Sequence, residues 1–261
     1  MRASKQATEY QHTVAAPIWL EQPGGSPSMR ICPAPADHGI VFVRGGVALP
    51  DRRIPALWSH LDPKRPEVLS NRFGVTVSNL QDTLAALRLC GIDNARIDLT
   101  TDRLPNVAGG FTDLLQRLTA LGKRRHSTLR RFIEVMRPVQ IEGDTQVLSI
   151  EPSNGERHCI QTRGSEFAID LEQTQVADWQ TLRHGSALKS SIALIALAGA
   201  PVHGLIKSHA PDSRSYARLL DKLLNDRNNW RVGYAIHTAA SSFATPVDAK
   251  FQASHALCLQ Q

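Results

Sequence analysis

The first half of the chain contains two segments in which apolar side chains recur at helical spacing. In residues 79–90 the leucines fall about one turn apart, and Gly91 is a natural end for the helix. Residues 111–121 show the same spacing and are followed by Gly122. Residues 94–99, between the two segments, are predicted to form a strand. The pattern therefore predicts a helix, a strand and a second helix in that order.

The second half of the chain repeats this order. Residues 186–198 form an apolar helical segment ended by Gly199, residues 202–208 follow as a strand, and residues 213–224 form another amphipathic helix. Because the two sets of elements lie at a nearly constant offset, we interpret them as an internal repeat. The predicted fold class is α+β, with two similar domains, each a β-sheet layered with helices.

The two domains are expected to span residues 1–124 and 125–261. The basic stretch at residues 123–126 is predicted to be the linker between them. Residues 49–66 are rich in proline and arginine and are predicted to be a loop. The second domain is expected to open with four strand-like segments, at residues 137–141, 146–151, 158–162 and 166–171.

Composition is that of a folded globular protein. Hydrophobic residues make up 42% of the 261 residues and charged residues 21%. No apolar run approaches the roughly 18 residues of a membrane span, and residues 1–16 lack the apolar stretch of a signal peptide. The four cysteines lie far apart and form no C-x-x-C pair, which is typical of buried cytosolic thiols. We therefore expect a cytoplasmic protein.

Three stretches carry a resemblance to a known family. They are PAPADHGIVF at residues 33–42, VSNLQDTLAAL at residues 77–87 followed by GIDNA at 91–95, and LAGAP at residues 197–201. Together they resemble the zinc-dependent UDP-3-O-acyl-N-acetylglucosamine deacetylase of lipid A synthesis. The resemblance implies two similar domains, each pairing helices with a β-sheet, with the active site between them.

The resemblance also implies a zinc site, and the residues at the matching positions differ from it. The family holds Zn²⁺ with two His and one Asp, and a Glu acts as general base. An amide in place of that Glu has no useful basicity, and a hydroxyl is a poor zinc ligand. We therefore expect no metal, no cofactor and no catalytic residue at the degenerate positions, which are Gln81, Asp82, Ser186, Ala187, Ser190, Leu194 and Ser213.

A polar cluster is the hypothesis for what replaces the ion. If the two helices face each other as in the family, Lys189 lies near Asp82 and substitutes an ion pair for the cation. The competing interpretation is that Lys189 is a solvated helical lysine.

The histidines and serines of the second half offer two other chemistries, a relocated metal site and a serine nucleophile. His203 and His209 lie about 20 Å apart on a strand, so with His184 they are poorly placed for one ion. Ser186 and Ser190 lie near His184, but no G-x-S-x-G elbow surrounds either serine. Packed or surface histidines and hydrogen-bonding serines are the simpler interpretation.

The clustered basic residues raise the alternative that the protein binds nucleic acid. Residues 123–125 with Arg130 and Arg131 are positively charged, but aromatic residues make up only 5% of the chain and no stacking platform accompanies them. A solvated stretch between domains is the preferred interpretation, and no nucleic-acid partner is expected.

The sequence thus favours a non-catalytic homologue that acts by protein or ligand binding in the regulation of lipid A or lipopolysaccharide synthesis. The expected partner is a protein of that synthesis or its control. Nucleotide-sugar binding is a weaker possibility, because Ala187 and Leu194 stand where the family has charged groups. The alternative is a metal-independent enzyme with a relocated active site on the same fold.

Overall fold

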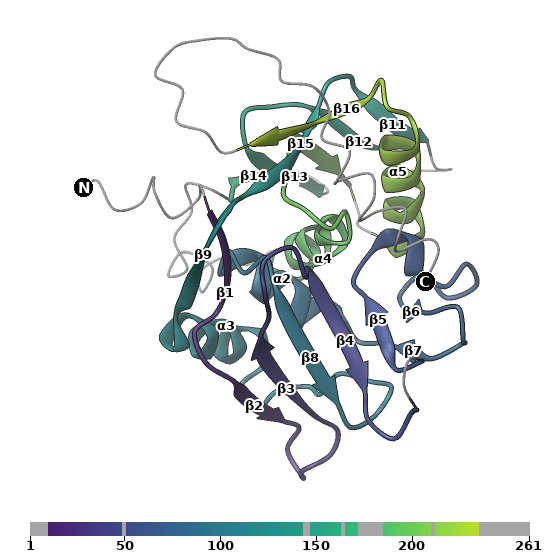
Figure 1. Cartoon of the computed structure of the whole chain (residues 1–261). Helices are drawn as coiled ribbons and strands as arrows, with labels where there is room; N and C mark the ends of the chain where they lie inside the picture. Colours follow the sequence, from purple (N-terminus) through teal and green to yellow (C-terminus); the bar gives the residue numbers. More distant parts are fainter. Residues whose placement is uncertain are drawn as a thin grey trace.

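A computed structural model gives the fold of the chain. It describes residues 10–48, 51–142, 147–162, 165–171, 185–209 and 212–234. Figure 1 shows two sheets with helices α2 (Gln81–Leu89) and α4 (Gly185–Ala196) at the centre of the molecule between them. The predicted α+β class, with sheets layered against helices, is confirmed.

The first sheet has five strands, in which apolar side chains face the core. Its centre is the parallel pair of β4 and β8, and antiparallel strands complete both sides. Helices α2 (Gln81–Leu89) and α3 (Gly110–Leu121) follow the predicted segments closely, and Gly122 ends α3 with a positive φ of 76°. The strand order is β2 (Ile18–Glu21), β3 (Ser28–Pro33), β8 (Ala95–Leu99), β4 (Ile40–Arg44) and β5 (Arg53–Pro55).

The second sheet is built around β15 (Val202–Ser208), which pairs parallel to β10 and β13 and antiparallel to β12. Helices α4 (Gly185–Ala196) and α5 (Ser213–Asn225) flank β15 in the chain, as α2 and α3 flank β8. The remaining strands are β10 (Arg131–Val135), β11 (Val139–Glu142), β12 (Val147–Pro152), β13 (Glu156–Thr162), β14 (Ser165–Asp170) and β16 (Trp230–Tyr234).

The prediction that residues 123–126 form a linker is wrong. They begin strand β9 (Lys123–Leu129), which pairs antiparallel with β1 (Tyr10–Val14). Most β9 side chains are exposed, so the strand lacks the apolar alternation that would have identified it, and backbone hydrogen bonds hold it instead. The expected domain boundary after residue 124 falls inside this strand.

The expected loop at residues 49–66 also contains short regular elements. These are β5, already described, and the 3₁₀ turn η1 (Trp58–His60). A further two-stranded ribbon follows, formed by β6 (Leu69–Ser70) and β7 (Thr76–Val77).

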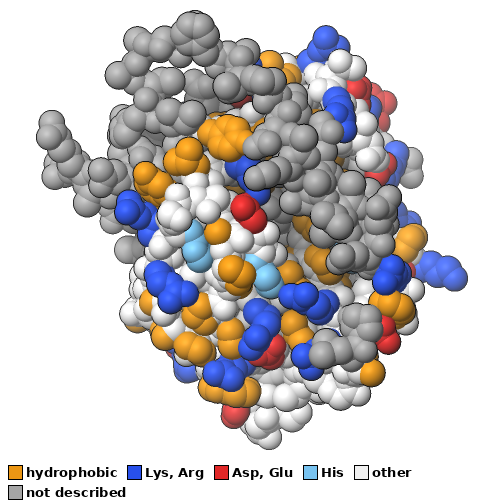
Figure 2. Space-filling view, viewed as in Figure 1, with side chains coloured by type: hydrophobic (Ala, Val, Ile, Leu, Met, Phe, Trp, Pro, Cys, Tyr) orange, Lys and Arg blue, Asp and Glu red, His pale blue; other side chains and the backbone are white. Residues whose placement is uncertain are grey.

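On the face shown in Figure 2, Lys and Arg side chains are separated by apolar and acidic ones.

One apolar core joins the two halves of the chain. Helix α2 packs directly against α4, and the buried Leu84 and Leu87 of α2 belong to the same cluster as Leu188 and Ile192 of α4. A buried leucine contributes about 1.5–3 kcal/mol relative to an exposed one. The two central helices therefore stabilise both sheets together and bring the degenerate positions of α2 and α4 next to one another.

Candidate functional site

Two polar contacts join the first turn of α2 to the facing side of α4. Lys189 Nζ lies 2.6 Å from Asp82 Oδ1. The hydroxyl of Ser190 donates to Gln81 Oε1 at 3.1 Å. Helical geometry places Lys189 and Ser190 on neighbouring positions of one turn, so each reaches a different residue of α2. The structure thus brings together two pairs of adjacent residues, and the bonded Gln81 and Ser190 are 109 positions apart in the chain.

The ammonium of Lys189 has a second neighbour. It lies over the Phe111 ring, 5.5 Å from the centroid, in a cation–π contact with the start of α3. The Lys189 and Asp82 side chains keep 21% and 42% of their exposure, so solvent screens their attraction. The pair therefore adds at most about 1 kcal/mol to stability, and its main effect is to orient the two side chains.

Three of the degenerate positions line a cleft of about 370 Å³ beside the start of α2. Gln81, Leu194 and Ser213 line it, whereas Ser186 is exposed and Ala187 is packed against the core. Leucines dominate the rest of the wall, and charged side chains enter through Glu67 and Arg103. The site is consequently a mainly apolar cleft with polar groups at its edge.

The donor groups around this cleft limit what it can do. They comprise the carboxylates of Glu67 and, beside the cleft, Asp82, which already contacts an ammonium, together with amides and hydroxyls. An amide has no useful basicity for abstracting a proton. Within the described residues, no three His, Cys, Asp or Glu side chains are grouped closely enough to hold a metal ion.

The histidines considered as alternative ligands lie elsewhere. His203 stacks on Phe132 with the ring centroids 3.7 Å apart. His209 Nδ1 lies 3.3 Å from the carbonyl oxygen of Val147. His184 lies outside the described residues. The nucleophile hypothesis for Ser186 and Ser190 with His184 is therefore untested by the structure.

A Glu–His–Ser chain that the sequence interpretation missed lies in the interior. His158 Nε2 is 3.1 Å from Glu156 Oε1, and His158 Nδ1 is 2.7 Å from Ser191 Oγ. The Ser191 hydroxyl also lies 2.6 Å from the Tyr216 hydroxyl. This is the order of contacts that activates a serine nucleophile. The only sequence signal was that Glu156 and His158 lie two residues apart in a predicted strand region, which puts both on one face.

Burial determines the role of these hydrogen-bonded side chains. Glu156, His158 and Ser191 have no exposed surface, and Tyr216 retains only 1%. No substrate reaches such a serine in this structure. These hydrogen-bonded side chains therefore serve to connect β13, α4 and α5. Burial raises the pKa of the Tyr216 hydroxyl to about 12, which keeps it protonated as a donor.

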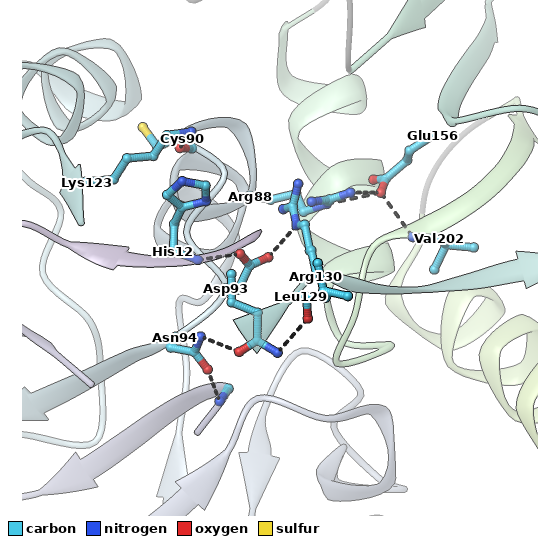
Figure 3. A network of polar contacts seen from close by, with 12 residues as sticks. His12, Arg88, Cys90, Asp93, Asn94, Lys123, Leu129, Arg130, Glu156 and Val202 are labelled. Atoms are coloured by element: carbon cyan, nitrogen blue, oxygen red, sulfur yellow. Dashed lines mark hydrogen bonds and ion pairs between the residues drawn. The ribbon is translucent and has the colours of Figure 1, made fainter. Parts of the chain in front are cut away.

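The same network extends to the first half of the chain (Figure 3). Arg88 of α2 bonds to Glu156 Oε2 through Nε, at 3.0 Å, and also through Nη2. The backbone N–H of Val202 donates to the same oxygen at 3.2 Å. Burial by itself would raise the pKa of the Glu156 carboxyl, but Arg88 and His158 together hold it well below its usual range. Glu156 is therefore a charged group that ties α2 to the second sheet.

Paired helices between two β-sheets, with the degenerate positions facing one another, define a two-half α+β protein with an inter-helix cleft. Its family follows from sequence comparison. The sequence model of UDP-3-O-acyl N-acetylglycosamine deacetylase matches residues 11–198, and the chain belongs to this family.

Curated relatives support this membership. A UDP-3-O-acyl-N-acetylglucosamine deacetylase of Phenylobacterium zucineum is 32% identical over 179 residues, which is 64% of this chain and 61% of the relative. One from Idiomarina loihiensis is 31% identical over 176 residues, 67% of this chain and 54% of the relative. The chain thus matches between about half and three fifths of the length of these relatives. No helix in the described residues is both long and apolar enough to cross a membrane.

Proposed function

We propose that this chain is a non-catalytic homologue of the lipid A pathway deacetylase, without a zinc site, and that it acts by binding. One observation carries the proposal: the Lys189 ammonium lies 2.6 Å from Asp82, where the family resemblance places the metal. A cation of the protein itself then neutralises the carboxylate that would otherwise serve as a ligand.

The chemistry of the neighbouring groups supports the same conclusion. Zinc sites use thiolate, imidazole and carboxylate donors, with an open position for water in catalytic sites. Gln81 and Ser190 offer an amide and a hydroxyl, and these bond to each other. For zinc to bind at Asp82, it would have to displace Lys189 and recruit ligands from groups that are poor donors.

The proposed role is regulatory. A protein that keeps the deacetylase fold without its chemistry is suited to bind a protein of lipid A synthesis or its control, in the cytoplasm where we place this chain. Binding of a nucleotide sugar is the second option for the cleft. Its mainly apolar wall, which includes Leu194, favours the protein partner.

An alternative function is favoured by one observation, the Glu156–His158–Ser191 chain. It would make the protein a metal-independent enzyme with a relocated serine nucleophile. The complete burial of all three side chains opposes this function. It requires α4 to move away from β13 and α5 before any substrate could reach Ser191.

Metal content tests the proposal directly. The full chain, purified without chelator and with zinc or cobalt supplied, is expected to hold well under one metal ion per chain. The matched comparison is a variant that restores the family residues, Gln81→Glu with Asp82→His, Ser186→His and Ser190→Asp. With its fold checked by circular dichroism, this variant should gain metal. One tightly held zinc per wild-type chain would overturn the proposal.

The regulatory role needs a separate measurement. The purified chain is added to an active deacetylase of the family, and binding and turnover are recorded together. A saturable change in kcat/KM, with direct binding at the same concentrations, supports the role. Thermal stabilisation by UDP-sugars with no effect on the active enzyme would instead indicate a nucleotide-sugar sensor.

A further inference from the structure

A second cleft, of about 210 Å³, lies at the other end of α2. It is enclosed by the first sheet, the end of α4 and the start of β10, and Leu84 is the only residue that it shares with the cleft at the degenerate positions. Most of its wall is apolar. The apolar part comes from both halves of the chain and includes Ile40, Leu57, Leu87, Ala196 and Pro201.

The polar part of this wall consists largely of arginines that are paired with carboxylates. Three arginines line the cleft, Arg88, Arg130 and Arg131, against two aspartates, Asp37 and Asp93. The carboxylate that pairs with Arg88 is the fully buried Glu156, which does not line the cleft. Arg130 and Arg131 are paired in turn with Asp93 and Asp37, so a further anion must bind through an N–H donor that these ion pairs leave free.

One nitrogen of the Arg130 guanidinium has no hydrogen-bond partner among the described residues. Its Nε bonds to Asp93 Oδ1 at 2.7 Å, and Asp93 Oδ2 accepts from the backbone N–H of His12 (Figure 3). The nitrogen concerned is Arg130 Nη2, which is buried. An unsatisfied buried donor costs about 1–3 kcal/mol, so an acceptor that reached Nη2 after a small side-chain shift would recover that energy.

We propose that this cleft binds a small monocarboxylate with an apolar body. The carboxylate accepts from Arg130 beside Asp93, and the apolar body lies on the wall formed by Leu57 and Ala196. The cleft is smaller than the roughly 300–1,000 Å³ of sites for drug-sized ligands, which restricts the ligand to a few carbon atoms or one ring. This site uses none of the degenerate positions and does not depend on whether zinc binds.

Calorimetric titration of the full chain with three probes tests both parts of the ligand. Benzoate supplies the charge and the apolar body, benzamide replaces the carboxylate by a neutral amide, and acetate lacks the ring. At constant ionic strength, benzoate is expected to bind saturably. Benzamide and acetate should each bind at least about tenfold more weakly, which corresponds to about 1.4 kcal/mol. No saturable heat with benzoate, or equal binding of benzamide, would overturn the proposal.

Variants locate the binding within the fold. Arg130→Gln should abolish benzoate binding, whereas Arg231→Gln, which removes an exposed guanidinium paired with Glu134, should leave it unchanged. Because Arg130→Gln also leaves Asp93 without its partner, Ala196→Met provides a second test that fills the cleft and keeps every charge. Benzoate binding that survives both Arg130→Gln and Ala196→Met would place the ligand elsewhere and refute the site.

Discussion

At the scale of single residues, burial changes the chemistry of His12 and Glu156. His12 keeps 4% of its exposure, and its pKa falls to about 4 because of burial and then because of the positive charge of Lys123. Glu156 has no exposure and stays charged because Arg88 faces it. A neutral histidine and an ionised glutamate are thus both part of the folded state.

His12 predicts a pH dependence of stability. Between about pH 4 and 6.5 the unfolded chain binds a proton on this histidine and the folded chain does not, so stability falls as the pH is lowered through this range. Between pH 7 and pH 5 the loss attributable to His12 is about 2 kcal/mol. Urea unfolding at both pH values should therefore show a smaller difference for His12→Gln than for the wild type. An unchanged difference would show that folding does not lower the pKa of His12.

We expect a conservative replacement of Glu156 to destabilise the folded protein strongly. Glu156→Gln keeps the shape of the side chain but leaves the Arg88 guanidinium buried without its counter-charge, which should lower the free energy of unfolding by about 3–5 kcal/mol. The matched control is Glu134→Gln, whose partner Arg231 is largely exposed, with an expected loss of about 1 kcal/mol or less. Similar losses in the two variants, measured by urea unfolding, would contradict the assigned role.

At the scale of elements, helix α4 connects several parts of the molecule through neighbouring side chains. Lys189 and Ser190 reach α2, whereas Ser191 points to His158 of β13 and Tyr216 of α5. Successive helical residues point about 100° apart, so adjacent serines have different neighbours. The apolar spacing predicted the helix itself, but it did not distinguish the buried serine from the half-buried one.

The two serines provide a matched pair for mutation. Ser191→Ala should lower the free energy of unfolding by about 1–3 kcal/mol, because His158 and Tyr216 each lose a buried partner. Ser190→Ala removes one bond near the surface and should cost about 1 kcal/mol or less. Thermal and urea unfolding measure both values.

The same pair tests the alternative enzymatic function. A fluorophosphonate probe, which reacts with activated serines, is expected to label neither Ser190 nor Ser191 in the folded protein. Labelling of wild-type protein that disappears in Ser191→Ala, but persists in Ser190→Ala, would support a relocated nucleophile.

At the scale of the whole molecule, the two halves share one interior. Helices α2 and α4 pack together, and the Arg88–Glu156 ion pair crosses from the first half to the second sheet. The strand pair β1–β9 adds backbone hydrogen bonds beside this junction. These contacts favour cooperative unfolding despite the internal repeat.

Two buried cysteines report on this cooperativity. Cys32 lies in β3 of the first half and Cys159 in β13 of the second, and neither forms a disulfide among the described residues. Thiol labelling at increasing urea, resolved by mass spectrometry, should give the same midpoint for both. A clearly lower midpoint for one cysteine would show that its half unfolds independently, as separate domains would.

The amino-acid sequence by itself determined the elements whose signals are local. Leucine spacing and glycine stops located α2 and α3, helical spacing located α5, and β15 is the strand expected after Gly199, because helix and strand periods are encoded in neighbouring residues. The motif resemblance identified the family, which the family match confirms.

Only the tertiary structure decided which distant residues meet. β9 carries mostly exposed polar side chains, so only its backbone pairing with β1 identifies it as a strand. The bond between His158 of β13 and Ser191 of α4 joins residues 33 positions apart in the chain. No local pattern marks this serine, or its connection to Glu156. The separation of Lys189 and Asp82 depends on how α2 packs on α4. Contacts of this kind depend on the folded chain, because burial and orientation are properties of the whole core.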